Sequence, residues 1–236
     1  MASSETILTV ENLRVAFGQQ IVIDDLSFAV HKGDCLAVIG PNGAGKTVLL
    51  KALLDLLPHQ GEIRWSEGTR LGYVPQKVAA DRHQPIRLAD LLASKAAVRH
   101  LPAGDIATVT DEVGLSPQVL KNSVGQLSGG QFQKALIAFA LLGRPNVLLF
   151  DEPTASLDEL AEEHTYELLH RLQQEKGMTV ILVSHDLSVV YRYATQVLCL
   201  SKAKTCVGPP KELLTPGMLE ELYGGPSKFY RHIHDD

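Results

Sequence analysis

A glycine-rich segment, Gly40 to Thr47, constrains the fold of this chain more than any other feature. Its sequence is Gly-Pro-Asn-Gly-Ala-Gly-Lys-Thr, which matches the pattern G-x-x-x-x-G-K-[ST]. An apolar run, Cys35 to Ile39, precedes it, and a helical stretch from about Gly45 to Leu57, stopped by Pro58, follows it. A chance glycine turn is the alternative, but the order strand, loop, helix favours a nucleotide-binding α/β fold.

The residues of this segment have defined parts in binding ATP. Glycines let the backbone wrap closely around phosphate oxygens with its N–H groups pointing inward. We expect Lys46 to reach the β- and γ-phosphates and Thr47 to offer its hydroxyl to Mg²⁺. The predicted ATP-binding residues here are Gly40, Pro41, Asn42, Gly43, Ala44, Gly45, Lys46, Thr47 and Val48.

A second buried strand, Val147 to Phe150, ends in two adjacent carboxylates. An acid at the carboxyl end of a parallel strand faces the ligand side of the sheet. We therefore expect Asp151 to hold the Mg²⁺ shell through water, and Glu152 to polarise or deprotonate the attacking water. The alternative is that both acids cap the element that begins near Pro153, but their pairing with the phosphate loop favours catalysis.

The rest of the chain alternates strands with helices, which indicates an α/β fold with a mostly parallel sheet. Helical spacing dominates from about residue 78 to 142 and predicts an inserted helical subdomain. We expect one domain over 1–236, with a core at about 1–77 and 143–225 and a tail at 226–236. Expected strands are 7–10, 13–17, 26–30, 35–39, 62–65, 71–74, 147–150, 179–183 and 196–200, and a helix is expected over 160–176.

Composition narrows the function classes. Lys plus Arg total 22 against 27 Asp plus Glu, a net charge of −5 that argues against nucleic acid as a partner. No apolar run is long enough for a transmembrane helix, and the first residues lack a secretory signal, so we expect a cytoplasmic protein. Cys35, Cys199 and Cys206 are expected to be reduced thiols, with Cys35 and Cys199 packed in the core.

The segment Leu127-Ser-Gly-Gly-Gln131 separates one class of P-loop ATPase from the others. Its spacing alone predicts a turn with a helix cap at Ser128. With the two elements above, it makes the chain resemble the ABC transporter ATPase family from about Leu8 to Gly225. The resemblance implies a RecA-like P-loop NTPase core, an antiparallel β subdomain, and a homodimer in the ATP-bound state. In that dimer Ser128, Gly129, Gly130, Gln131 and Asp158 would contact ATP held by the other subunit.

Three further residues resemble functional positions of the family. Gln76 corresponds to the glutamine that senses the γ-phosphate and Mg²⁺, and His185 to the histidine that contacts the γ-phosphate. Phe17 resembles the aromatic residue that stacks on adenine, where Tyr is commoner. A structural role for His185 and a core position for Phe17 are the alternatives. Together with Lys46 and Glu152, Gln76 and His185 form the predicted catalytic set.

Several positions depart from the family pattern. Val48 follows Thr47 where a second hydroxyl residue is usual, which removes a contact to the α-phosphate. Lys134 stands where Arg is usual, and Phe139 replaces a charged residue. These departures bear on interface contacts and leave the central catalytic set intact.

The unfused domain resembles the ATP subunits of bacterial importers. Residues 72–77, 196–200 and 219–225 are similar to the zinc/manganese importer group, although Ser201-Lys-Ala-Lys204 stands where that group often has histidines. The resemblance implies a peripheral position on the inner face of the membrane, integral-membrane permease subunits and, indirectly, an external solute-binding protein. The tail histidines, His232 and His234, either bind metal or are solvated.

Other functions stay open at this point. An ABC exporter or an importer of another solute has the same ATPase, because cargo is chosen by the permease. A soluble ABC ATPase that acts on DNA or ribosomes is disfavoured by the acidic balance, by the single domain and by the absence of sustained heptads.

Overall fold

The computed structural model describes residues 5–76, 85–102, 104–152, 159–201 and 205–223. Its contacts divide the chain into two compact units. Unit one comprises residues 1–69 and 179–236, and unit two comprises residues 70–178. Asp158, the C-terminal tail with His232 and His234, and the part of the predicted helical subdomain before residue 85 lie outside the described residues.

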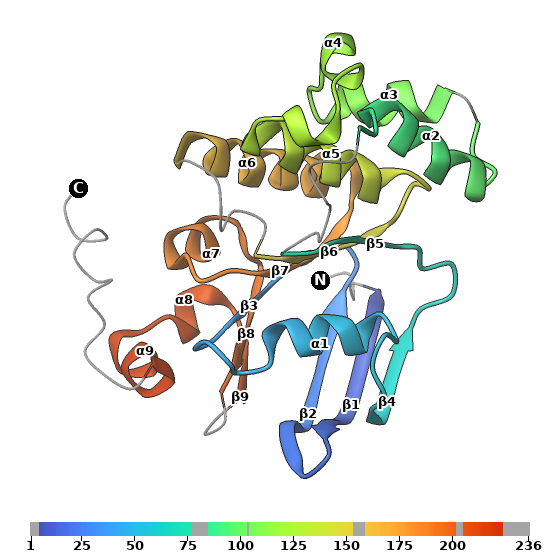
Figure 1. The fold of residues 1–236 in the computed structure, drawn as a ribbon. Coiled ribbons are helices and arrows are strands. Elements are labelled where there is room, and N and C mark those ends of the chain that lie inside the picture. Colours follow the sequence, from blue (N-terminus) through green and yellow to red (C-terminus); the bar gives the residue numbers. More distant parts are fainter. Residues whose placement is uncertain (1–4, 77–84, 103, 153–158, 202–204, 224–236) are drawn as a thin grey trace. The chain divides into compact units, whose positions relative to one another are not determined.

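Unit one holds strands of two kinds (Figure 1). The strands are β1 (Thr6–Phe17), β2 (Gln20–His31), β3 (Cys35–Ile39), β4 (Gln60–Trp65), β7 (Thr179–Val183), β8 (Gln196–Leu200) and β9 (Thr205–Gly208). An antiparallel sheet has the order β2-β1-β4, and it confirms the antiparallel β subdomain that the family resemblance implied. Elsewhere β3 lies between β7 and β8, parallel to both, and β9 pairs antiparallel with β8. All five residues of β3 and of β7 are buried, which is typical of parallel strands covered on both faces.

The strands β1 and β2 are longer than predicted. Residues 7–10 and 13–17, predicted as two strands, belong to the single strand β1, and β2 begins six residues before Leu26. Asn12 and Asp25 both adopt left-handed conformations (φ 50° and 49°), and the Asn12 side-chain amide donates to the Asp25 carboxylate at 2.8 Å. This bulge accommodates the polar residues without ending the ladder.

The helices of unit one are α1 (Lys46–Leu53), α7 (Leu187–Tyr193), α8 (Pro210–Leu213) and α9 (Pro216–Tyr223). The prediction that α1 extends to Leu57 was wrong. Asp55 takes a left-handed conformation (φ 55°) and its N–H donates to the Ala52 carbonyl at 2.9 Å. The Leu56 N–H closes the helix end on the Lys51 carbonyl, also at 2.9 Å, so the helix stops before Pro58 is reached.

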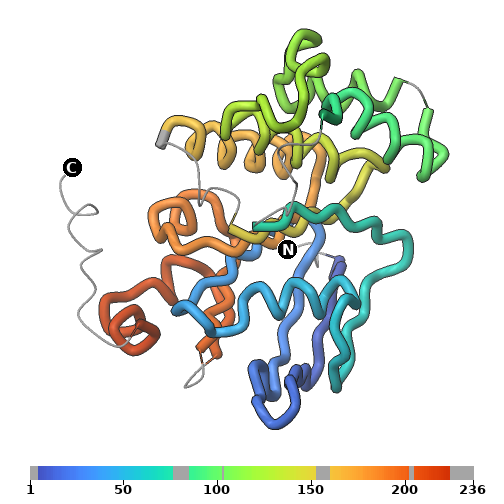
Figure 2. The backbone as a smooth tube through the Cα atoms, viewed as in Figure 1, coloured from blue at the N-terminus to red at the C-terminus, as the bar shows by residue number. Residues whose placement is uncertain are grey.

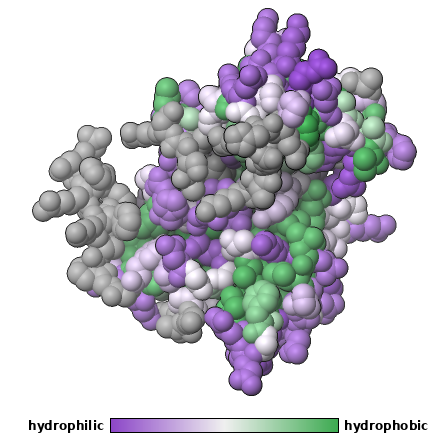
Figure 3. Space-filling model, viewed as in Figure 1, coloured by the Kyte–Doolittle hydropathy of each residue, from purple (hydrophilic) through white to green (hydrophobic). Residues whose placement is uncertain are grey.

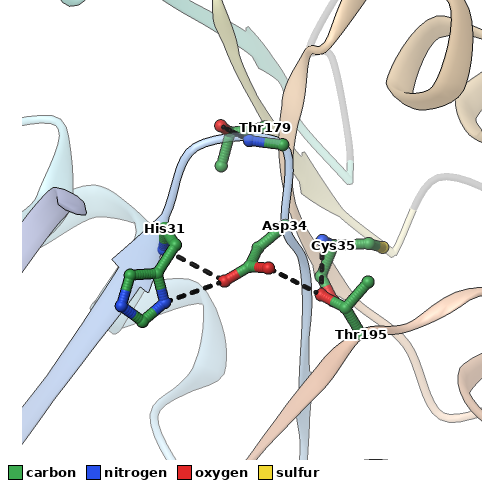
Figure 4. A network of polar contacts seen from close by, with 6 residues as sticks. His31, Asp34, Cys35, Thr179 and Thr195 are labelled. Atoms are coloured by element: carbon green, nitrogen blue, oxygen red, sulfur yellow. Dashed lines mark hydrogen bonds and ion pairs between the residues drawn. The ribbon is translucent and has the colours of Figure 1, made fainter. Parts of the chain in front are cut away.

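A polar network fixes the start of β3, the strand that leads into the phosphate loop (Figure 4). The Asp34 carboxylate accepts from the His31 backbone N–H at 3.0 Å and from the Thr195 hydroxyl at 3.2 Å. The Thr195 hydroxyl oxygen in turn accepts from the Cys35 N–H at 3.0 Å, and the Thr179 hydroxyl accepts from the Gly33 N–H at 2.9 Å. The network thereby joins β2, β3, β7 and β8 at the end of β3 opposite the loop.

The cysteines differ from the sequence prediction in one respect. Cys35 is a free, buried thiol, and Cys199 is buried in β8, both as predicted. Cys199 and Cys206, however, form a disulfide between β8 and β9. The prediction of three reduced thiols was therefore wrong for this pair, because antiparallel pairing sets the two residues directly opposite each other, with a Cα–Cα distance of 4.9 Å.

In the described residues of unit two, β5 and β6 pair in parallel and most of the other elements are helices. Its elements are β5 (Leu71–Val74), β6 (Val147–Asp151), α2 (Leu88–Val98), α3 (Gly104–Glu112), α4 (Pro117–Leu120), the 3₁₀ helix η1 (Val124–Gln126), α5 (Gly129–Leu141) and α6 (Glu159–Lys176). The chain leaves β5, forms α2 to α5, and returns through β6 to α6 (Figure 2). The α/β class with a mostly parallel sheet is confirmed, while the boundaries proposed for the helical subdomain stay a prediction.

Candidate functional site

The predicted phosphate loop lies in unit one between β3 and α1. Its glycines at 40, 43 and 45 have φ angles of 150°, 78° and 100°. A Cβ on Gly40 would lie 2.0 Å from the Leu200 carbonyl oxygen, and one on Gly45 would lie 2.9 Å from a Val22 methyl group. Glycine is therefore required at position 40 by the clash with the backbone, and at position 45 chiefly by a φ that other residues rarely adopt. Gly45 is the N-cap of α1 and supplies no side-chain cap, which leaves the positive helix end for an anion.

Lys46 points back into this loop. Its ammonium donates to the Gly40 carbonyl at 2.8 Å and to the Pro41 carbonyl at 3.1 Å, and the residue is only 7% exposed. The cation is thus held beside the inward-facing loop, where a phosphate would lie. The next two residues, Thr47 and Val48, are half-buried, and Asn42 and Gly43 are exposed. A loop of this shape suits the triphosphate of ATP.

Phe17 ends β1 at the hairpin with β2 and is 49% exposed, next to Ile21 at 40%. The alternative of a core aromatic is wrong, because half of the residue faces solvent. Figure 3 shows apolar side chains gathered on the visible face in the region of β2 and α1. Val22 of β2 lies close to Gly45, since a Cβ on that glycine would be 2.9 Å from a Val22 methyl group, so β2 adjoins the phosphate loop. An apolar surface there suits a purine ring.

His185 follows β7 in unit one and is exposed, whereas Ser184 before it is 2% exposed. The turn is fixed by Asp186, whose N–H donates to the Ser184 hydroxyl at 3.1 Å and whose carboxylate caps α7 through the Ser188 N–H at 2.8 Å. A histidine presented to solvent on a fixed turn at a strand's carboxyl end is placed for a ligand rather than for the core.

Unit two brings together three of the predicted residues. Asp151 ends β6 and is 1% exposed. Glu152 follows it in a left-handed conformation (φ 44°), and the side-chain amide of Gln76 donates to its carboxylate. A non-glycine residue with positive φ stores strain that is concentrated at functional sites. The side chains of Gln76 and Glu152 therefore meet just beyond the ends of β5 and β6, and Asp151 precedes Glu152 in the chain.

Sequence reasoning missed Tyr73 in the same place. It lies on β5 opposite Leu149 of β6, so parallel pairing puts it on the sheet face that Asp151, two residues further on, also occupies. Burial, the negative charge of Asp151 and a hydrogen bond to that carboxylate raise the pKa of Tyr73 to about 12. The protonated phenol is thus a neighbour of the predicted Mg²⁺-shell acid, and no sequence pattern indicated it, because the pairing of β5 with β6 is set by the fold.

The segment at 127–131 forms the start of α5. Ser128 is the N-cap: its hydroxyl accepts from the Gln131 N–H at 3.2 Å, and the Gln131 side-chain oxygen accepts from the Ser128 N–H at 3.1 Å. The helix cap predicted from spacing is confirmed. Ser128 and Gly129 are exposed, and a Cβ on Gly130 would lie 3.4 Å from the Ala161 methyl group of α6. Gly130 thus allows close packing of α6 while the helix start stays accessible.

The two helical departures are explained in part. Lys95 of α2 donates from its ammonium to the Phe139 carbonyl, and the ammonium lies 4.2 Å from the centre of the Phe139 ring. Phe139 therefore joins α2 to α5 by a cation–π contact and by capping of the α5 carboxyl end. Lys134 borders a hollow beside Gly130 and Gln131.

Comparison with known proteins identifies the family of the chain. The family model for the ABC transporter matches residues 23–155. The chain is 34% identical to the zinc import ATP-binding protein ZnuC of Haemophilus influenzae over 99% of its own length and 87% of the relative's. It is 36% identical to the protein of the same name from Pseudomonas entomophila, over 98% and 90%. A solved inward-facing ABC transporter assigned to the metal-chelate type superposes with a TM-score of 0.85 at 30% identity, over 94% of this chain and 90% of that one.

A glycine-rich loop on a buried strand, an acid strand and a capped signature helix define a P-loop ATPase. The chain belongs to the ABC transporter family and is an ATP-binding, ATP-hydrolysing subunit that works with a membrane permease. Among the described residues, no helix is long and apolar enough to cross a membrane.

Proposed function

We propose that this chain hydrolyses ATP to drive the import of zinc through a separate permease, from the inner face of the membrane. The observation that carries the proposal is the extent of the match: relatives named for zinc import align with nearly the whole chain at 34–36% identity. The metal-chelate type of the structural neighbour supports the same cargo class. An external solute-binding protein would deliver the ion to the permease.

The site residues divide the reaction between them. The loop from Gly40 to Val48 binds the phosphates, Lys46 neutralises the β- and γ-phosphate oxygens, and Phe17 stacks on adenine. Glu152 accepts a proton from the attacking water. The water oxygen bonds to the γ-phosphorus while the bond from that phosphorus to ADP breaks. Gln76 orients Glu152 through the amide contact, and His185 stabilises the charge that develops on the γ-phosphate.

The residues fit Mg²⁺ by the chemistry of their donor atoms. A hydroxyl on Thr47, a buried carboxylate on Asp151 and a side-chain amide oxygen on Gln76 are hard oxygen ligands of the kind Mg²⁺ prefers. These three residues would hold Mg²⁺, and the bound ion would supply positive charge against the phosphates of ATP. The hydrogen bond from the Tyr73 hydroxyl helps to fix the orientation of the Asp151 carboxylate.

Two copies acting together complete the scheme. The exposed start of α5, from Ser128 to Gln131, and Asp158 would contact ATP bound by the other copy. ATP then holds the homodimer closed, and loss of the γ-phosphate releases it, which passes a two-state motion to the permease. The exposed N-cap geometry of Ser128 supports this role, because helix N–H groups and a hydroxyl bind phosphate.

The proposal is tested by elemental analysis of native cells with and without this protein in metal-limited medium. A selective fall in zinc, restored by the intact chain and not by Glu152→Gln, is the expected result. A selective fall in manganese or iron would move the cargo to that metal. An unchanged metal profile would refute metal import and leave the ATPase in place.

A further inference from the structure

The disulfide between Cys199 and Cys206 is a feature that ATP hydrolysis does not use. The two residues face each other across β8 and β9, and β9 is the edge strand. Cys199 is 1% exposed and packs among the apolar side chains of unit one, whereas Cys206 is half-buried. An oxidant or reductant in solution therefore has access to the pair from the Cys206 side.

The disulfide lies one residue from the phosphate loop. Cys199 pairs with Ile39, the last residue of β3, and Gly40 begins the loop immediately afterwards. The carbonyl of Leu200, next to Cys199, approaches Gly40 so closely that a Cβ there would lie 2.0 Å from it. Any shift of the β8 end is thus transmitted to Gly40 by direct contact.

The end of β8 and the start of β9 form one wall of a hollow. This cavity of about 240 Å³ is lined on one side by β2, at Ile21 to Asp24, and on the other by Leu200, Ser201 and Thr205. Leu200 is adjacent to Cys199, and Thr205 is adjacent to Cys206, so the disulfide fixes both parts of the second wall. The first wall includes Val22, a methyl group of which would lie 2.9 Å from a Cβ on Gly45, at the other end of the loop.

We propose that Cys199 and Cys206 form a reversible thiol–disulfide site that sets the affinity of the phosphate loop for ATP. The inference rests on the proposed function, because a chain that faces the cytoplasm meets a dithiol-rich compartment in which disulfides are transient and regulatory. A dithiol reductant attacks the Cys206 sulfur and forms a mixed disulfide, and Cys199 leaves as a thiolate that takes a proton. The second thiol of the reductant then closes its own disulfide and frees Cys206, so that two electrons and two protons reach the protein.

Reduction removes a covalent restraint while the β8–β9 hydrogen bonds stay. The oxidised pair holds Leu200 against Gly40 and keeps the loop organised for phosphate, so the oxidised form binds ATP more tightly. Coupling between two such sites is at least about fivefold in affinity where it is functional. We expect the dissociation constant for ATP to rise about fivefold on reduction and to return on reoxidation.

The test is calorimetric titration of Mg·ATP into the full chain, first as oxidised by glutathione disulfide and then as reduced by dithiothreitol. Alkylation of the unfolded protein and intact-mass measurement count the thiols, with one expected for the oxidised form and three for the reduced form. Cys206→Ser should bind ATP as the reduced protein does in both conditions. Cys35→Ser is the matched control, because this buried thiol lies at the opposite end of β3 and should leave the response intact.

Equal ATP affinities for the two forms would overturn the inference while leaving the ATPase assignment untouched. Failure of the pair to oxidise or to be reduced, seen as an unchanged thiol count, would overturn it as well. If neither form binds ATP, the proposed function fails, and this inference fails with it.

Discussion

The side-chain amide of Gln76 donates a hydrogen bond to the carboxylate of Glu152, and Glu152 holds a left-handed backbone conformation (φ 44°). The pair joins the segment that follows β5 to the end of β6, next to the buried Asp151. A carboxylate kept in one orientation by an amide donor, at a strained position, is preorganised to take a proton from water.

The first prediction concerns the carboxylate itself. Glu152→Gln keeps the shape of the side chain and removes the proton acceptor, so ATP hydrolysis should fall by about 10²–10⁴-fold, the usual contribution of a general base. ATP binding should persist, and the variant should accumulate as an ATP-dependent dimer. Phosphate release and size-exclusion chromatography with Mg·ATP measure the two effects. Turnover within threefold of the wild type would remove Glu152 from its role.

His185 is predicted to stabilise charge on the γ-phosphate. His185→Ala should lower the rate by about 10²–10³-fold, as expected when one preorganised charge-stabilising group is lost. Because His185 is exposed, the same variant should unfold at the wild-type temperature. His164, a histidine in helix α6 of unit two, is the matched control, and His164→Ala should keep the wild-type rate. A loss of less than threefold for His185→Ala would make that residue structural.

Gly40 tests the geometry of the phosphate loop. An alanine there would put its Cβ 2.0 Å from the Leu200 carbonyl, so Gly40→Ala should lose ATP binding by tenfold or more, on the order of 1.4 kcal/mol. Gly68→Ala is the control, because Gly68 also has positive φ (77°) but meets nothing within 4 Å. Nucleotide titration should separate the steric effect of Gly40 from the backbone strain that both share. Equal ATP affinities for the two variants would argue against the contact.

Much of the fold and site was accessible from the sequence because local patterns determine it. The buried strands β3, β6 and β7 are short apolar runs, and the loop after β3 has an unmistakable glycine spacing. Three features were not accessible from the sequence: the bulge at Asn12, the early end of α1 at Asp55 and the pairing of Cys199 with Cys206. Each depends on a backbone conformation or a cross-strand register that residue types alone do not encode. Tyr73 was missed for the same reason.

The fourth prediction is a pH effect at Lys95. Burial, and then the charge of Arg99, lower the pKa of Lys95 to about 8 from its ordinary 10.5. Between these pH values the unfolded chain binds more protons than the folded one, so the free energy of unfolding should rise with pH across this window. Lys95→Met fills similar space without a titrating group and should flatten that rise. Urea unfolding at pH 7.5 and 9.5 compares the two proteins, and identical pH slopes would contradict the shift.

The last prediction concerns docking to the permease. Arg87, the N-cap of α2, pairs with Asp90 at 3.1 Å, and their side chains are 65% and 60% exposed. An exposed pair contributes little to stability, on the order of 0–1 kcal/mol, so reversing either charge should leave folding and ATP binding unchanged. Both Arg87→Asp and Asp90→Arg should weaken co-purification with the permease and the stimulation of ATP hydrolysis by it.

The double exchange, Arg87→Asp with Asp90→Arg, restores the internal pair but not the surface pattern. If the permease binds these charges at their own positions, the double variant stays defective. Full recovery would show that docking needs only the ion pair at the start of α2, not the position of each charge. Wild-type coupling in both single variants would place the contact elsewhere on the chain.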